Sequence, residues 1–88
     1  MLDMSIERGD FWRRLQAAVD SPFVQAGSDA CVAADGRWRI ALADLPDLSI
    51  GLLRLARLQV KIELISMDDA AAAAFHARFD AYFQRGGG

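Results

Sequence analysis

Apolar and polar residues alternate without a break in the segment 57–64, and this pattern predicts a β-strand. In that segment every even-numbered position is apolar and every odd-numbered position is polar: Leu58, Val60, Ile62 and Leu64 are the apolar set. A period of two is what an antiparallel strand needs when one face is packed and the other faces water. We therefore expect these four side chains to face a hydrophobic core.

A second set of strands is predicted over residues 30–42, where the dipeptide Asp35-Gly36 separates two short apolar segments. Asp-Gly supplies the positive φ angles that tight hairpin turns require, so this segment reads as a β-hairpin. Trp38, Ile40 and Leu42 alternate with polar or small residues and are expected to face inward. We expect the following residues 44–47, which include Pro46, to break the second strand and begin a loop.

Helical spacing appears at both ends of the chain. Apolar residues recur every three or four positions over 11–19, and Asp10 is a candidate cap for that helix, which could also begin a turn earlier. Ser21-Pro22 is expected to end it and to start a short turn that stops at Gly27. A longer helix is predicted from a cap at Ser66 or Asp68 through residue 85, with a stripe of phenylalanines on one side.

Residues 45–55 are the ambiguous segment, because leucine occurs there too often for one face of a strand and Gly51 weakens a helix. A β-bulge near Leu52-Leu53 would reconcile the alternation on its two sides. The segment could be a bent strand, a short helix that completes the core, or an exposed interface.

Taken together, these elements predict an α+β fold with two layers. The expected sheet is antiparallel and three-stranded, or four-stranded if residues 45–55 contribute, and the N-terminal and C-terminal helices cover one of its faces. The chain has 88 residues, a length that suits a single domain over 1–88. Just over half the residues are apolar and a quarter are charged, which is typical of a packed globular domain.

Composition also predicts a compartment. Cys31 is the only cysteine, so no internal disulfide can form, and a reducing cytoplasm is the expected location. The N-terminus lacks a basic stretch followed by an apolar core, and no run of apolar residues is long enough to cross a membrane. We expect neither export nor membrane insertion.

The residues that could carry catalysis are few. Cys31 and His76 are the obvious nucleophile and base, and Asp80 lies one helical turn after His76, but nothing in the pattern brings the cysteine to the histidine. The same inventory offers no pair of metal ligands at a recognised spacing. We expect no catalysis, no metal and no cofactor.

Cations gather on one side of the predicted sheet. The alternation that points apolar residues inward points Arg37, Arg39, Arg57 and Lys61 outward, although the formal net charge of the chain is −2. Such a surface could bind an anionic ligand or nucleic acid. No aromatic side chain is interleaved for base stacking, and long charged side chains commonly cover an exposed sheet face, so this reading is the alternative.

The favoured hypothesis is a module for protein interaction or an accessory subunit, with a homodimer or a larger protein as its partner. It depends on the leucine-rich segment, whose candidate interface residues are Leu48, Ile50, Leu52, Leu53 and Leu55. If the alternation of residues 57–64 continues backward, Leu53 and Leu55 lie on the same side as the arginines. A domain of this size has little depth in which to bury them, and an exposed apolar strip usually marks a contact surface.

Overall fold

The computed structural model describes residues 2–19 and 21–87, with side chains as far as Phe83. Its elements over these residues are, in chain order, β1 (Leu2–Met4), α1 (Arg8–Ala18), β2 (Phe23–Ala26), β3 (Ala30–Ala33), β4 (Trp38–Ile50), β5 (Leu53–Leu64) and α2 (Asp69–Gly87). The predicted α+β class is confirmed. The sheet has five strands, however, so the expected number of three or four was too low.

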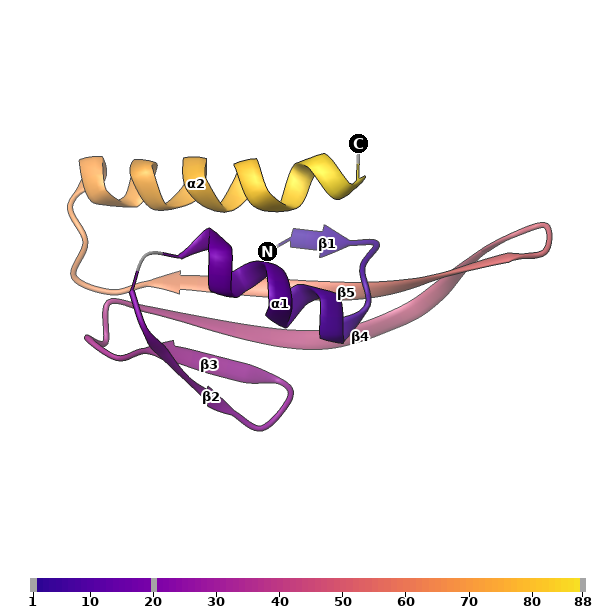
Figure 1. Cartoon of the computed structure of the whole chain (residues 1–88), viewed down its shortest axis with the longest axis horizontal. Coiled ribbons are helices and arrows are strands. Elements are labelled where there is room, and N and C mark those ends of the chain that lie inside the picture. The colour runs from indigo at the N-terminus through magenta and orange to yellow at the C-terminus, as the bar shows by residue number, and fades with distance from the viewer. Residues whose placement is uncertain (1, 20, 88) are drawn as a thin grey trace.

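The sheet is antiparallel throughout, with the strand order β1-β5-β4-β3-β2 (Figure 1). The predicted hairpin turn at Asp35-Gly36 joins β3 to β4, and Gly36 has a φ of 75°. The Asp35 side chain accepts a hydrogen bond of 3.0 Å from the backbone N–H of Arg37, which fixes the turn. The β4–β5 hairpin is the longest feature of the fold and runs through the middle of the sheet (Figure 1).

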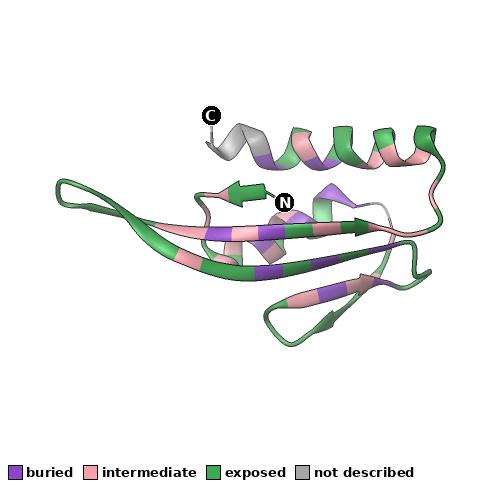
Figure 2. Ribbon diagram, turned by 180° about the vertical axis from the view of Figure 1, so that it is seen from behind, coloured by how far each residue is buried: buried purple, intermediate pink, exposed green. Residues whose placement is uncertain are grey.

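Both helices pack against the same face of the sheet, which we call the inner face; the opposite one is the outer face. Because side chains alternate along a strand, the inner face carries the even-numbered residues of β5 and of the first part of β4. Their buried members meet the apolar sides of the two helices in one core: Phe11, Leu15, Ala18, Trp38, Ile40, Leu42, Leu58, Val60, Phe79 and Phe83. The inward orientation predicted for residues 57–64 is therefore confirmed (Figure 2).

The segment from Ser21 to Gly27 differs from the prediction. Residues 23–26 form β2, an edge strand paired with β3, and not a helical stub. Pro22 excludes a continuation of α1 but does not exclude a strand after it. In the structure the carbonyl of Pro22 accepts a hydrogen bond of 3.0 Å from the N–H of Ala34. This contact extends the pairing of β2 with the end of β3, which a local pattern could not reveal.

The two helices begin near their predicted caps. Helix α1 starts at Arg8, and its N-cap is Glu7, which lies three residues, about one turn, before the predicted cap Asp10. The Asp68 carboxylate accepts a hydrogen bond of 2.7 Å from the N–H of Ala71, so Asp68 caps α2 as expected. Helix α2 continues to Gly87, beyond the predicted end at residue 85.

Hairpin β4–β5 corrects two further expectations. Strand β4 continues through residues 44–47, where a loop was predicted. The expected bulge exists, but it lies between Leu45 and Leu48 and not near Leu53: Leu45 pairs with Arg57 and Leu48 with Leu55, so β4 contains one residue more than β5 over this interval. Pro46 and Asp47 lie in the bulge, and the hairpin continues beyond them to its tip.

Arg8 of α1 connects the helix to the turn between β2 and β3 and to strand β4. Its guanidinium donates to the backbone carbonyl of Ser28 at 2.8 Å and forms ion pairs with Asp29 and Asp44, each at 2.6 Å. The Arg8 side chain is largely covered, whereas both carboxylates are well exposed. Solvent screening therefore reduces the contribution of these pairs.

We expect Arg8→Met to lower the free energy of unfolding by about 1–2 kcal/mol, because three charge-assisted hydrogen bonds are lost while the aliphatic stem is kept. Urea unfolding followed by circular dichroism measures this loss. The matched control is Arg13→Met on the same helix, which removes only an exposed pair with Asp10 and should change stability by less than about 0.5 kcal/mol. Equal effects of the two substitutions would contradict this role of Arg8.

Candidate functional site

The far part of the β4–β5 hairpin, residues 45–57, extends beyond the rest of the sheet, and we call it the arm. Among the described strands, β3 pairs with β4 only as far as Ala41, and β1 pairs with β5 only over Leu58–Val60. No helix covers the arm in either ribbon view (Figures 1 and 2). The arm is thus a two-stranded ribbon, a structure that is at best marginally stable in water without further packing.

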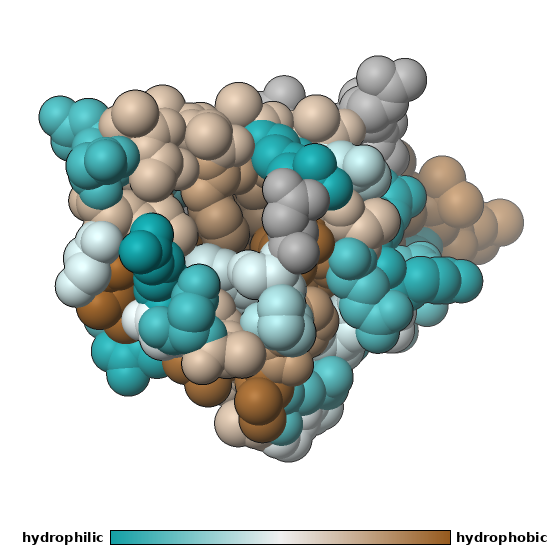
Figure 3. Space-filling view, turned by 60° about the vertical axis from the view of Figure 1, so that its left-hand side comes forward, coloured by the Kyte–Doolittle hydropathy of each residue, from teal (hydrophilic) through white to brown (hydrophobic). Residues whose placement is uncertain are grey.

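The exposed large apolar side chains of the described residues are concentrated in this arm. Leu52 at the tip is fully exposed, Leu53 is 63% exposed and Ile50 is 57% exposed, with Leu48 and Leu55 near 40%. They form the apolar projection that stands clear of the body at the right of Figure 3. All five residues were predicted interface residues, and the structure brings them together in one place.

Four of these side chains share one face of the arm. Leu48 pairs with Leu55 and Ile50 with Leu53, and residues directly opposite each other in an antiparallel pair project from the same face. We call this set, Leu48, Ile50, Leu53 and Leu55, the leucine face. Ser49 pairs with Arg54 and lies on the other side, so the arm is amphipathic.

The leucine face belongs to the outer face of the sheet. Strand β5 has no irregularity between Leu53 and Leu64, so Leu53 and Leu55 project on the same side as Arg57 and opposite to the buried Leu58 and Val60. This confirms the orientation predicted for the two leucines. The bulge in β4 brings Leu48 and Ile50 to that side as well.

Strand β5 therefore has its apolar residues on the inner face in the body and on the outer face in the arm. A strand that serves only the core of one domain keeps its apolar residues on a single face. Fully burying an aliphatic side chain of this size contributes about 1.5–3 kcal/mol, so leaving a group of them in water gives up a substantial stabilisation. The reversal of the apolar face is the feature that sets the arm apart from the body.

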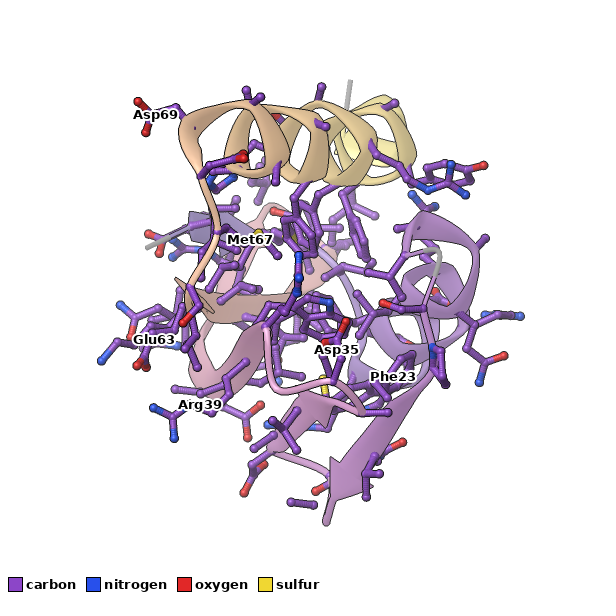
Figure 4. All side chains as sticks on the ribbon, turned by 90° about the vertical axis from the view of Figure 1, so that its left-hand side faces the viewer. Phe23, Asp35, Arg39, Glu63, Met67 and Asp69 are labelled. Carbon is purple, nitrogen blue, oxygen red and sulfur yellow. The ribbon has the colours of Figure 1, made fainter. Side chains whose placement is uncertain are left out.

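The structure brings together only some of the cations of the predicted basic surface, and carboxylates lie among them. Arg39 and Glu63 lie side by side at the sheet (Figure 4) and form an ion pair of 2.8 Å, and Arg57 lies 3.6 Å from Asp3 of β1. The hydrogen bond from Arg39, together with its charge, lowers the pKa of the Glu63 carboxyl below its usual range. Two of the four predicted cations are therefore neutralised by carboxylates on the same face, and Lys61 is the third member of the group there.

Arg37 does not join that group. It lines a pocket of about 230 Å³ at the end of the molecule opposite the arm, together with Trp38, Met67 and Phe75. Asp35 and Met67 mark this end of the molecule in Figure 4. The alternation that predicted an outward Arg37 does not hold in the turn that precedes β4, because the residues before Trp38 are outside the strand.

Asp3 is a contributor to this surface that the sequence did not reveal. It lies on β1, whose three residues are too few for a periodic signal, and it reaches Arg57 only because β1 pairs with the middle of β5. The alternation Leu2-Asp3-Met4 is compatible with a strand but is too short to indicate one.

The candidate catalytic residues lie in different settings. Cys31 is buried in β3, where desolvation raises the pKa of its thiol to about 11, against a smaller effect of a hydrogen bond from the backbone of Ile40. His76 is exposed on α2, and its ring meets the edge of Phe75. Nucleophilic cysteines are partly exposed and have a lowered pKa, so the environment of Cys31 is that of a core residue. No group of three or more His, Cys, Asp or Glu side chains within the described residues is arranged to hold a metal ion.

The described geometry thus defines a small α+β domain with an amphipathic arm. The chain matches no protein-family model, no curated protein and no solved structure. Among the described residues, no helix has the length and apolar character needed to cross a membrane.

Proposed function

We propose that this protein acts by contact, as a small protein-interaction module or accessory subunit that self-associates through the arm and has no catalysis of its own. The observation that carries the proposal is the leucine face, which is exposed and lies on a ribbon without other support. Burial of these side chains against a partner would stabilise both the contact and the arm itself. Contiguous exposed apolar side chains of this kind commonly mark interaction sites.

The test is a change of charge on each side of the arm. Leu53→Asp places a carboxylate on the leucine face, and in a symmetric dimer it does so twice, so we expect the dissociation constant to rise by at least about 100-fold. The matched control is Ser49→Asp, which adds the same charge to the opposite side of the same ribbon and should leave association within about threefold of wild type. Sedimentation velocity over a range of protein concentrations measures both.

Two results would count against self-association. One is a wild-type protein that sediments as a monomer up to high micromolar concentration, and the other is an equal loss of association in the two variants. Circular dichroism of each variant checks that the domain remains folded.

Binding of an anionic ligand through the basic residues has weaker support. The carboxylates of Asp3 and Glu63 already lie beside two of the arginines, which lowers the positive potential of the surface. We therefore place the function in the arm.

A further inference from the structure

The outer face of the β4–β5 hairpin continues without interruption from the body of the sheet into the leucine face. The register of the hairpin gives its cross-strand pairs on this face, from the body to the tip: Arg39–Glu63, Ala41–Lys61, Ala43–Gln59, Leu45–Arg57, Leu48–Leu55 and Ile50–Leu53. Apolar residues dominate the arm, with Arg57 at its base, small residues occupy the neighbouring part of β4, and the remaining charged residues lie at the end farthest from the tip.

The leucine face alone is small for a stable interface, because its four side chains are already 37–62% covered in the single copy. The whole hairpin, at about 3.3 Å per residue and two strands wide, presents a strip of roughly 40 by 10 Å. The flat area of this strip is roughly 400 Å², about half of the roughly 800 Å² per partner of a standard interface, and the arm alone presents only about half of the strip. A stable contact therefore needs the body part of the hairpin as well as the arm.

The charges on this strip are self-complementary in one orientation. In this orientation two copies stack face to face, and a two-fold axis runs between them, parallel to the hairpins. Each residue of β4 then faces, in the second copy, the β5 residue with which it pairs in its own copy. Arg39 faces Glu63 of the second copy, Ala41 faces its Lys61, Leu45 faces its Arg57, and the leucine faces meet each other. No two like charges are opposed. If the copies instead ran in opposite directions about the centre of the leucine face, their bodies would lie at opposite ends and only the arms would touch.

We infer that two copies of this chain pack their outer faces together with the arms parallel and the tips adjacent, in the manner of two stacked sheets. This inference rests on the self-association proposed above and adds its geometry. Each hairpin then covers the apolar residues that the fold of a single copy leaves exposed.

A cysteine at the tip tests the orientation. Leu52→Cys in a Cys31→Ala background places one thiol at the fully exposed end of the arm. With the tips adjacent, mild oxidation is expected to convert most of the dimer into a disulfide-linked form. The matched control is Ala73→Cys in the same background, an exposed position on α2, which should give only the slow crosslinking of random collisions.

The outcomes separate the inference from the proposed function. Rapid crosslinking at position 52 alone, in protein that sediments as a dimer, supports the parallel arrangement. A dimer that crosslinks at position 52 no faster than at position 73 would overturn this arrangement while leaving self-association intact. A monomer would overturn both.

Charge reversal in the body provides a second test, independent of the tip. Arg39→Glu would place two carboxylates opposite each other in the parallel dimer, so we expect the dissociation constant to rise by about tenfold. The exchange Arg39→Glu with Glu63→Arg restores opposite charges and should return it toward the wild-type value. In a dimer held by the arms alone, Arg39→Glu would leave association unchanged, and that result would contradict the inference.

Discussion

Replacing Phe79 by alanine is expected to lower the free energy of unfolding by about 3–5 kcal/mol. Phe79 is 1% exposed, and its ring stacks on Phe83 with the ring centroids 4.3 Å apart and on Phe75 at 6.3 Å. The lost ring would leave a cavity between α2 and the sheet that these neighbours cannot fill. A domain of this length has a total stability of only about 4–13 kcal/mol, so the variant should be largely unfolded near physiological temperature.

Urea unfolding followed by circular dichroism measures this effect. His76→Ala is the matched control: it lies on the exposed side of the same helix and should change the stability by less than about 0.5 kcal/mol. If the two variants unfolded at the same urea concentration, the core position of Phe79 would be wrong.

The phenylalanine stripe of α2 shows what the sequence could predict. Phe79 and Phe83 repeat at the spacing of one helical turn, and the structure buries both of them. The alternation over residues 57–64 likewise predicted which side of β5 faces the core. These elements were predictable because each carries a periodic pattern long enough to exclude the competing structure.

The short edge strands could not be predicted in the same way. β1 has three residues and β2 has four, so neither contains more than two residues on one face. The extended conformation of β1 is fixed by pairing with β5, which lies far away in the sequence, and that of β2 by pairing with β3, which follows it after the turn at residues 27–29. The contact of β1 with β5 is tertiary information and leaves almost no local trace.

The arm was predictable in its composition and in its orientation, but not in its extent. Pro46 was interpreted as the end of a strand because proline cannot donate to a ladder. In the structure it lies within a bulge, on a part of β4 that has no neighbour on the β3 side. A strand that is open along one edge tolerates a missing N–H, so the proline bends the hairpin locally without ending it.

The candidate site was thus located by the alternation of side chains along the strands and not by any motif. The alternation of the sequence alone places Leu53 and Leu55 opposite the core, and the bulge in the structure adds Leu48 and Ile50 to the same face. The alternation gave the wrong orientation for Arg37, because Arg37 precedes its strand. It gave no information on Asp3. A pattern of alternation therefore gives a correct face only within the strand that it defines.

The environment of Cys31 leads to a prediction about alkaline pH. Burial raises the pKa of its thiol from 9.0 to about 11 in the folded chain. Between these two pH values the thiol of the unfolded chain loses its proton while that of the folded chain retains it, so unfolding is favoured as the pH rises. The contribution of the buried neutral thiol is complete below about pH 9 and is lost by about pH 11. At about 1.4 kcal/mol per pKa unit, the loss amounts to roughly 2–3 kcal/mol.

Cys31→Ala isolates this contribution from the titration of other groups. Near pH 7 the variant should be about 1 kcal/mol less stable than wild type, because a buried sulfur is lost. Above pH 9 only the wild type acquires the thiol penalty, so its free energy of unfolding should fall faster than that of the variant, and the two curves should cross between about pH 9 and 11. Urea unfolding at pH 7, 9 and 10.5 measures both curves. Parallel curves across this range would mean that the Cys31 thiol ionises as readily in the folded chain as in the unfolded chain, and that its site is open to water.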